Sequence, residues 1–419
     1  MLVSRHTALR SMATLPIAKL KVGKDVPVRA GHPWVFSEAI QAIAPAEAGS
    51  LVEVQDHRGN FLGIGMWNPH TSIRIRLLAR HPKTIIDTSF FLKRFQTLAA
   101  WKEKHLPSQT NGYRLVHSEA DELPGLIIDR YANTFVFQIH TAGMDRFRHL
   151  IIEALTQLGA EQHIQNLCIV ERSDLDARTQ EGVRPLKPEV HVGTVTEPIL
   201  FQEYGLNFSA DTLHGQKTGF FLDQREARHA VATLAKGKRV LNLFGYTGAF
   251  SVHALAGGAS FVQTVDASEL ALKGAEAQMR LNAIDPNDEK RVGLLEADIF
   301  ELLTEENLPG GPYDLIICDP PALAKSASHV PQALKAYTFL NGACLKHLQP
   351  GGILVASSCS GRVEPEDFRN ALRLASGRAG RTVRLLDWIT QPVDHAERLA
   401  FPEGRYLKTA ILEVTDLLT

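Results

Sequence analysis

Strands and helices alternate along the second half of the chain, from about residue 205 onward. Short apolar runs of strand length are each followed by a turn and then by a segment with the apolar spacing of a helix. The expected strands lie at 240–244, 261–265, 292–295, 315–318 and 353–356, with helices at 249–255, at 334–348 and ending at 281. Strands joined by helices usually pair in parallel, and the helices then cover both faces of the sheet. This pattern predicts a mostly parallel, doubly wound α/β domain.

The first 200 residues follow a different pattern. Short segments at 18–22, 51–54, 61–65 and 73–77, separated by turn residues, predict a small β-barrel or β-sandwich. Helices are then expected at 90–105 and 147–158, strands at 126–128 and 134–139, and a Pro-rich linker at 183–198. At 419 residues the chain is also too long for one hydrophobic core. We therefore expect a disordered tail at 1–14, a β domain at 15–86, a central α+β domain at 87–200 and the α/β domain at 201–419. An organelle transit peptide is the alternative for the tail, which is basic and has no acid.

Composition excludes several classes of protein. No apolar run approaches the roughly 18 residues that a membrane-spanning helix needs. The four cysteines are widely spaced and form no Cys-x-x-Cys pair, which argues against a zinc site and a disulfide framework and fits a reducing cytoplasm. Residues 1–90 carry eleven Lys and Arg against six Asp and Glu. This basic region suits contacts with nucleic-acid phosphates, although a solvated surface explains the charge equally well.

A glycine turn closes the first strand of the α/β domain, at Phe244-Gly245-Tyr246-Thr247-Gly248. Two glycines let the backbone turn tightly beside a ligand. Asp266, followed by Ala267, ends the second strand, where a carboxylate can accept both ribose hydroxyls. Asp298 and Ile299 follow the third strand and are placed to contact an adenine. The turn lacks the glycine spacing of pyrophosphate-binding enzymes, so S-adenosylmethionine (SAM), which has no phosphate, is the expected cofactor.

Two reactive side chains follow neighbouring apolar runs. Asp319 comes directly after 315–318, within Cys318-Asp319-Pro320-Pro321, and Cys359 follows 353–356, within Ser357–Gly361. The carboxyl ends of parallel strands form the ligand crevice of such a sheet, so a thiol and a carboxylate there can act on one substrate. A thiolate that attacks C6 of a pyrimidine makes C5 nucleophilic, which is covalent catalysis of carbon methylation. The alternative for Cys359 is a purely structural role as a small buried core residue.

Several motifs together resemble the bacterial large-subunit rRNA cytosine-C5 methyltransferases of the RlmI type. The matching segments are Gly31–Ser37, Asp121–Leu126, Gly215–Arg225, Phe244–Gly248, Cys318–Pro321, Ser358–Gly361 and Phe401–Lys408. The resemblance implies a class I SAM-dependent methyltransferase domain with a seven-stranded sheet, preceded by a PUA RNA-binding domain and a central domain. Two positions depart from the family pattern: Ala322 stands where a Lys is usual, and Tyr337-Thr338-Phe339 stands in place of Tyr-Lys-Asp.

The resemblance also implies roles for individual residues. Cys359 would be the nucleophile, and Asp319 would hydrogen-bond the cytosine ring and also border the cofactor. The cofactor site would include Gln216, Thr218 and Asp223 besides the turn. The RNA, large-subunit rRNA, would contact Lys24, Arg29, Trp34, Arg74, Arg76, Lys217, Arg225, Pro320 and Pro321. Trp34 is equally consistent with a core position, and Lys217 and Arg225 with caps or ion pairs.

Two rival functions remain at this stage. An Asp-Pro-Pro loop also serves methylation of guanine or adenine amino groups, but that chemistry needs no thiol and favours an aromatic residue where Ala322 stands. A non-catalytic RNA-binding assembly factor is the rival from another class. We expect a cytoplasmic protein without a bound metal or a membrane segment, and a homodimer is one option for its assembly.

Overall fold

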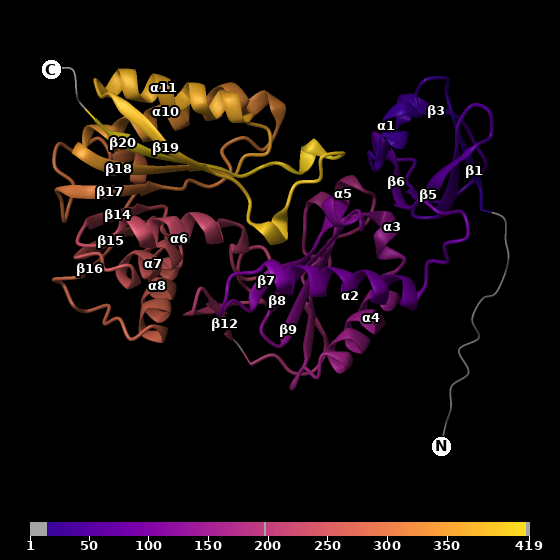
Figure 1. Ribbon diagram of the computed structural model, residues 1–419, viewed down its shortest axis with the longest axis horizontal. Coiled ribbons are helices and arrows are strands. Elements are labelled where there is room, and N and C mark those ends of the chain that lie inside the picture. Colours follow the sequence, from indigo (N-terminus) through magenta and orange to yellow (C-terminus); the bar gives the residue numbers. More distant parts are fainter. Residues whose placement is uncertain (1–14, 197, 416–419) are drawn as a thin grey trace.

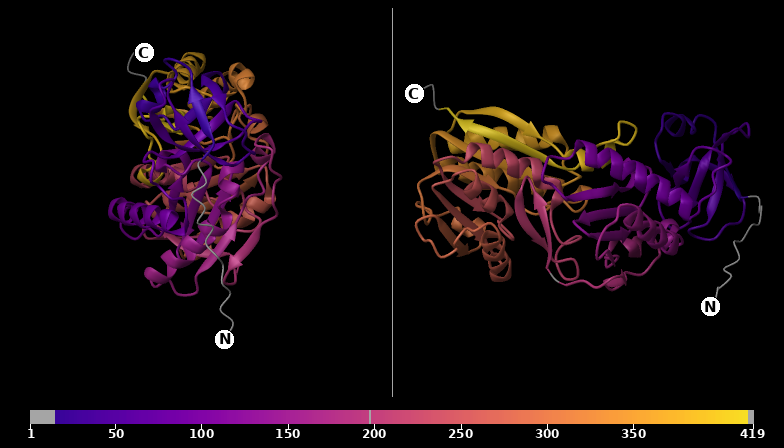
Figure 2. Two further views of the ribbon diagram at one scale, coloured as in Figure 1. Left: turned by 90° about the vertical axis from the view of Figure 1, so that its right-hand side faces the viewer. Right: turned by 60° about the horizontal axis from the view of Figure 1, so that its bottom comes forward.

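The computed structural model describes residues 15–196 and 198–415. The predicted tail at 1–14 lies outside the described residues. A six-stranded, a five-stranded and a seven-stranded sheet follow one another along the chain, with a two-stranded hairpin before the last. The molecule is elongated, with the N-terminal sheet at one end and the seven-stranded sheet at the other (Figures 1 and 2).

The N-terminal sheet has the strand order β2-β6-β5-β4-β1-β3. Its strands are β1 (Ile17–Leu20), β2 (Trp34–Phe36), β3 (Ile40–Ile43), β4 (Leu51–Gln55), β5 (Phe61–Trp67) and β6 (Ile73–Ala79), with a short helix α1 (Val26–Arg29) between the first two. Alternate side chains such as Val52, Val54 and Ile75 are fully buried in one core. The four strands expected in this region are all present.

The central sheet has the order β11-β10-β9-β8-β7. Its strands are β7 (Gly112–His117), β8 (Leu126–Tyr131), β9 (Thr134–Ile139), β10 (Cys168–Glu171) and β11 (Glu189–Val192). Helices α2 (Thr88–His105) and α4 (Arg148–Glu161) pack their apolar side chains against this sheet in a shared core. The segment 183–198 is not purely a linker, because β11 lies within it and pairs with β10. The hairpin strands β12 (Ile199–Glu203) and β13 (Leu206–Ala210) lead into the last sheet.

The seven-stranded sheet has the order β16-β15-β14-β17-β18-β20-β19. Its strands are β14 (Arg239–Leu243), β15 (Phe261–Asp266), β16 (Val292–Glu296), β17 (Tyr313–Cys318), β18 (Leu348–Ser358), β19 (Val383–Ile389) and β20 (Lys408–Val414). The first five in spatial order pair in parallel, and β20 runs antiparallel to both β18 and β19. The predicted doubly wound sheet is confirmed.

Helices cover both faces of this sheet (Figure 1). Helices α6 (Arg225–Leu234), α7 (Ala249–Ala256) and α8 (Glu269–Leu281) lie on one face, and α10 (Val330–Lys346) and α11 (Pro365–Ala379) on the other. Successive strand residues point to opposite faces, so Leu315 and Ile317 enter the first core whereas Ile316 and Cys318 enter the second. Both faces are therefore covered by mainly apolar side chains, and most of the polar side chains discussed below lie at the strand ends.

Residues 390–407, here called the strap, connect β19 to β20 and reach away from the sheet toward the other two regions (Figure 1). Near its tip, the Phe401 ring meets the Trp34 ring of the N-terminal sheet edge-on, with centroids 4.8 Å apart. Nearer the sheet, Asp394 forms an ion pair of 2.5 Å with Arg225, and both side chains are fully buried. The strap thus joins the three regions through buried contacts.

Removal of the Asp394 carboxylate tests this join. Asp394→Ala should lower the stability by about 3–5 kcal/mol, because it leaves the Arg225 guanidinium buried without its counter-charge. Urea unfolding followed by circular dichroism measures the loss. Glu397→Ala is the matched control, since it breaks a strap pair with Arg405 whose side chains are 25% and 45% exposed, and it should cost less than about 1 kcal/mol. Equal losses in the two variants would contradict the role of the buried pair.

Candidate active site

The carboxyl ends of β14, β15, β17 and β18 meet at one edge of the seven-stranded sheet. In the parallel registers Leu243 pairs with both Val265 and Cys318, and Cys318 pairs with Ala356. The residues that follow these strands therefore share this edge: the turn that begins at Phe244, then Asp266, Asp319 and Cys359.

The glycine turn is held in a strained conformation. Phe244 and Tyr246 have φ of 58° and 46°, values that residues with a side chain rarely adopt. The Tyr246 N–H donates a hydrogen bond of 2.8 Å to Asp266 Oδ2. Gly248 has φ of 74°, and a Cβ there would lie 2.7 Å from Ala275 Cβ, so α7 and α8 can approach only over a glycine. Asp266 and Gly248 thus hold the turn open toward the strand ends.

The third strand end carries Asp298 and Ile299. The Asp298 carboxylate accepts hydrogen bonds from the N–H groups of Phe300 and Glu301, so it caps the short helix α9 (Ile299–Leu302). Ile299 is 3% exposed and packs in the sheet core, so the prediction that its side chain contacts an adenine is not supported by its position. The neighbouring Phe300 is 38% exposed and stacks on Phe339, with ring centroids 6.0 Å apart. Sequence reasoning missed this exposed aromatic pair because α9 and α10 are distant in the chain.

Cys359 and the Asp-Pro-Pro loop lie against each other. The Cys359 Sγ is 3.9 Å from the Pro320 carbonyl oxygen, and the thiol is half-buried. Gln224, at the start of α6, donates its amide N–H groups to both Asp319 oxygens at 2.9 Å. Cys168, Cys318 and Cys344 are buried as expected for packing residues, and no group of three His, Cys, Asp or Glu side chains that could hold a metal is found among the described residues.

The turn that carries Cys359 is clamped by its two serine neighbours. Both hydroxyls reach the phenol of Tyr337 on α10, at 2.9 Å for Ser358 and 3.1 Å for Ser360. All three side chains are buried. The contact between these serines and Tyr337 could not be predicted from the motif around Cys359, because Tyr337 is some twenty positions away in the chain.

Burial sets the charge states of the thiol and the carboxyl. It raises the pKa of Asp319 to about 7, and the nearby Asp223 carboxylate adds to the effect. It raises the pKa of Cys359 to about 12, again with a contribution from a carboxylate, here that of Asp319. The free protein therefore holds a neutral thiol beside a carboxyl that is about half protonated at neutral pH.

Two buried acceptors next to Asp319 have no hydrogen-bond partner: Asp223 Oδ1 and Gln224 Oε1. The other Asp223 oxygen accepts from Lys217 Nζ at 3.0 Å and from the Tyr406 hydroxyl at 2.8 Å. Unsatisfied buried acceptors are costly, and a ligand that brings hydrogen-bond donors would satisfy them. The α-ammonium group of SAM and the amino group of a cytosine are both such donors, so the residues present fit the expected cofactor.

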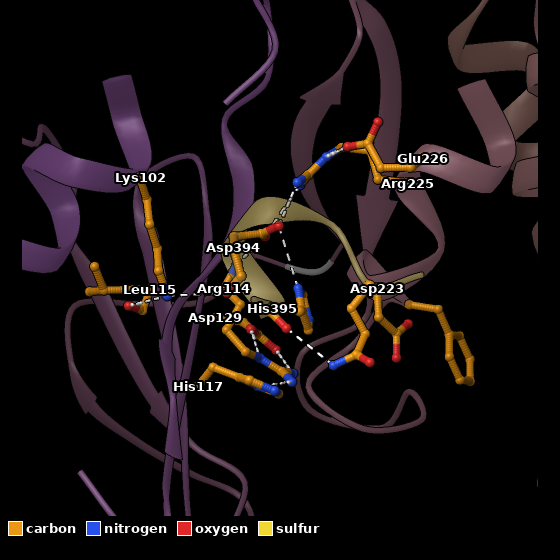
Figure 3. A network of polar contacts seen from close by, with 12 residues as sticks. Lys102, Arg114, Leu115, His117, Asp129, Asp223, Arg225, Glu226, Asp394 and His395 are labelled. Carbon is orange, nitrogen blue, oxygen red and sulfur yellow. Dashed lines mark hydrogen bonds and ion pairs between the residues drawn. The ribbon is translucent and has the colours of Figure 1, made fainter. Parts of the chain in front are cut away.

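A buried polar network lies between this site and the central sheet (Figure 3). Arg114 on β7 pairs with Asp129 on β8 at 2.8 Å, and the Arg114 backbone N–H donates to Asp394 of the strap at 2.9 Å. Lys102 on α2 donates to the Asp394 carbonyl at 3.1 Å. Although burial alone would raise it, the charges of His395 and Arg225 hold the pKa of Asp394 well below its usual range.

This network explains two positions that differ from prediction. Thr218 is fully buried, and its hydroxyl donates to Asp129 at 2.6 Å, so its side chain anchors the Gly215–Arg225 motif to the central sheet. Arg225 is also fully buried in its pair with Asp394 and has no access to RNA. Gln216 and Lys217, by contrast, are exposed.

The N-terminal residues predicted to bind RNA have varied surroundings. Arg76 pairs with Glu181 at 2.7 Å, and the Trp34 indole donates to Glu119 at 2.9 Å. Arg29 pairs with Asp25 and with Asp56, both at 2.6 Å. Only Lys24 of this set is exposed without an ion pair among residues 15–196 and 198–415, and Arg74 is half-buried. Of the two prolines after Asp319, Pro320 is buried and Pro321 exposed. In the described part of the chain, no helix is both long and apolar enough to cross a bilayer.

Variants of Asp266 and Asp298 test cofactor binding and helix capping separately. Asp266→Ala should weaken SAM binding at least about tenfold, because it removes the expected ribose acceptor and the hydrogen bond that holds Tyr246. Asp298→Ala should mainly cost about 1 kcal/mol of stability through the lost cap. Isothermal titration calorimetry with SAM and a thermal melt of each variant give the two readouts. Unchanged SAM affinity in Asp266→Ala would contradict this assignment.

Two regions of the chain match models of known protein families. Residues 184–390 match the model of an S-adenosylmethionine-dependent methyltransferase family, and residues 18–80 match that of a PUA-like domain. Among solved structures, a protein assigned as a SAM-dependent methyltransferase from Streptococcus mutans has the same fold, with a TM-score of 0.79 and 24% identity over 95% of this chain and 100% of its own. A similar structure, with a TM-score of 0.80, covers 95% of this chain and 99% of its own at 24% identity and was solved with SAH bound.

Curated relatives match nearly the whole length. The ribosomal RNA large subunit methyltransferase I of Shewanella denitrificans is 38% identical over 94% of this chain and 98% of its own. The protein of the same name from Alteromonas mediterranea is 37% identical over 95% of this chain and 98% of its own. This chain therefore belongs to the ribosomal RNA large subunit methyltransferase I family of SAM-dependent methyltransferases with an N-terminal PUA-like domain.

Proposed function

We propose that this protein methylates carbon 5 of a cytosine in large-subunit ribosomal RNA, with Cys359 as a transient covalent nucleophile. The names of its relatives support an rRNA substrate. One observation carries the choice of carbon over an amino group, namely the Cys359 thiol 3.9 Å from the Asp-Pro-Pro loop, at the strand ends that border the cofactor turn. An amino group methylated beside such a loop requires no thiol there.

The paired pKa values suggest how the thiol adds to the ring. With a pKa of about 12, only about one thiol in 10⁵ is ionised at pH 7. A protonated Asp319 can give its proton to N3 of the cytosine as the Cys359 sulfur bonds to C6, and the resulting carboxylate then takes the thiol proton. The ring gains S and H, the carboxyl is regenerated, and no net charge is left in the buried pocket.

The remaining steps follow from the chemistry of that adduct. Addition at C6 makes C5 enamine-like, and SAM, when bound, supplies the electrophilic methyl group. Loss of the protons on C5 and N3 then expels the sulfur, which recovers one of them as the thiol. The Tyr337 clamp keeps Cys359 at one position throughout addition and elimination.

The target base must leave its stack to enter the half-buried pocket. Exposed groups around the pocket, Lys217 and Pro321, and Lys24 and Arg29 of the PUA-like domain are proposed to contact the flanking RNA through phosphates and stacking. Trp34 serves the strap contact with Phe401, which favours its structural interpretation. The Asp319 role and these RNA contacts extend beyond what the family assignment provides.

Replacement of the thiol tests the covalent route. Cys359→Ala should reduce methylation of rRNA below detection while SAM binding stays within about threefold, because the thiol contributes to attack and not to the cofactor turn. Transfer of a radiolabelled methyl group and mass spectrometry of the RNA nucleosides measure the product. RNA that contains 5-fluorocytosine should form a protein–RNA adduct with the wild type alone. Full product formation by Cys359→Ala would leave amino-group methylation as the better explanation.

The pH dependence tests the acid. Because Asp319 must be protonated to act and its pKa is about 7, the single-turnover rate should fall as pH rises above about 7. Asp319→Asn should lose at least about 100-fold in rate. A rate that climbs steadily to pH 9 in the wild type would show that a free thiolate limits the reaction instead.

The same carboxyl should affect stability. Its folded pKa, about 7, lies above the value of about 4 in an unfolded chain, so its contribution to stability is complete below pH 4 and is lost as pH rises toward 7. Asp319→Asn lacks this loss and should be more stable than the wild type by a few kcal/mol at pH 8, although it is inactive. Urea unfolding at pH 4.5 and pH 8 measures the difference, which should shrink at the lower pH.

A further inference from the structure

A buried lysine lies beneath the turn that carries Cys359. Lys408 is the first residue of β20, pairs in register with Ser358 and is 1% exposed. Its ammonium group donates to the Ser360 carbonyl at 2.8 Å and to the Val363 carbonyl at 2.7 Å. Lys408 therefore holds the chain after Cys359 through its side chain, and the chain before Cys359 through its strand pairing with Ser358.

This cation has no ion pair with a carboxylate among residues 15–196 and 198–415. Burial lowers the pKa of Lys408 to about 8, and the groups whose charges raise it are Cys359 first and then Glu364. A buried ammonium without a counter-ion is costly, and a methionine would fill the same volume without that cost. A contribution to stability alone therefore does not explain why a lysine occupies position 408.

We propose that Lys408 is a positioning residue for the nucleophile: it fixes the Cys359 turn through two carbonyls and supplies positive charge beneath the sulfur when that sulfur becomes negative. The inference rests on the proposed function and deepens it. Tyr337 holds the turn from one side and Lys408 from the other, so the thiol has little freedom to swing away from the Pro320 carbonyl.

The electrostatic part follows from reciprocity. A thiolate at Cys359 raises the pKa of Lys408, so by linkage a charged Lys408 must favour the thiolate by the same factor. The other titratable groups that act on Cys359 are Asp319 and Asp223, which oppose the thiolate, and Lys217, which favours it. Lys217 is half-exposed and paired with Asp223, whereas Lys408 is buried and unpaired. This stabilisation of the thiolate should disappear as Lys408 loses its proton near pH 8.

Thiol alkylation without RNA measures this effect independently of methyl transfer. Cys359 would be labelled with iodoacetamide from pH 6.5 to 9.5 and the modified peptide quantified by mass spectrometry. At pH 7, Lys408→Met should react about tenfold more slowly than the wild type, as a rise of one in the thiol pKa requires. The wild-type plot of log rate against pH should bend near pH 7, where Asp319 becomes charged, and again near pH 8, whereas Lys408→Met should bend only near pH 7.

Two further variants guard the interpretation. Lys346→Met removes an exposed charge from the end of α10 and should leave the alkylation profile unchanged. Lys408→Arg keeps a charge that does not titrate in this range, so its profile should lack the bend near pH 8 and stay above that of Lys408→Met. If Lys408→Met fails to fold, as judged by SAM calorimetry and a thermal melt, the wild-type bend and the arginine profile still decide the question.

The outcomes separate the two levels of proposal. Equal rates and equal profiles without a bend near pH 8 in the wild type and Lys408→Met would overturn the role of Lys408, even if Cys359→Ala is inactive. Product formation by Cys359→Ala would overturn the covalent mechanism, whatever Lys408 does to thiol reactivity.

Discussion

The parallel pairing of β17 with β18 is the constraint on which the site depends. Ile316 and Cys318 bury on one face and Leu315 and Ile317 on the other, so both strands are locked in register by two cores at once. A slip of one residue would turn every apolar side chain toward the wrong face. Because the register is fixed, the residues that leave the two strands emerge side by side, and the Cys359 sulfur comes to lie against the Pro320 carbonyl.

The second contribution comes from outside the methyltransferase sheet. The strap, the Gly215–Arg225 motif and the central sheet meet in a network that contains Arg114, Asp129, Arg225 and Asp394, all paired and largely buried. Buried ion pairs of this kind add little net stability, but they tolerate only one arrangement of their partners. Asp223 and Gln224, at the end of the Gly215–Arg225 motif, are therefore positioned in part by a domain that supplies no reacting group itself.

Burial sets the protonation states of the reactive groups as well as stabilising the fold. The same desolvation raises the pKa of the Asp319 carboxyl and of the Cys359 thiol, so each group is kept neutral by its surroundings. Lys408 acts in the opposite sense, as a cation that burial makes easier to discharge. A neutral acid and a neutral thiol on neighbouring strand ends can exchange protons over a short path, and this is the property that the proposed addition to a cytosine ring requires.

Periodicity and local motifs by themselves determined the doubly wound sheet, the glycine turn after its first strand and the two strand ends that bear Asp319 and Cys359, because each depends on residues close together in the chain. Ile299, Thr218 and Arg225 were assigned to ligands from their motifs, whereas the fold gives them a core position, a link to Asp129 and a buried ion pair. Only the tertiary structure decided those partners, and only it brought Tyr337 and Lys408 to the Cys359 turn. The reason is physical: strand and turn propensities act over a few residues, whereas burial, charge pairing and pKa values arise from groups that meet only when distant segments pack together.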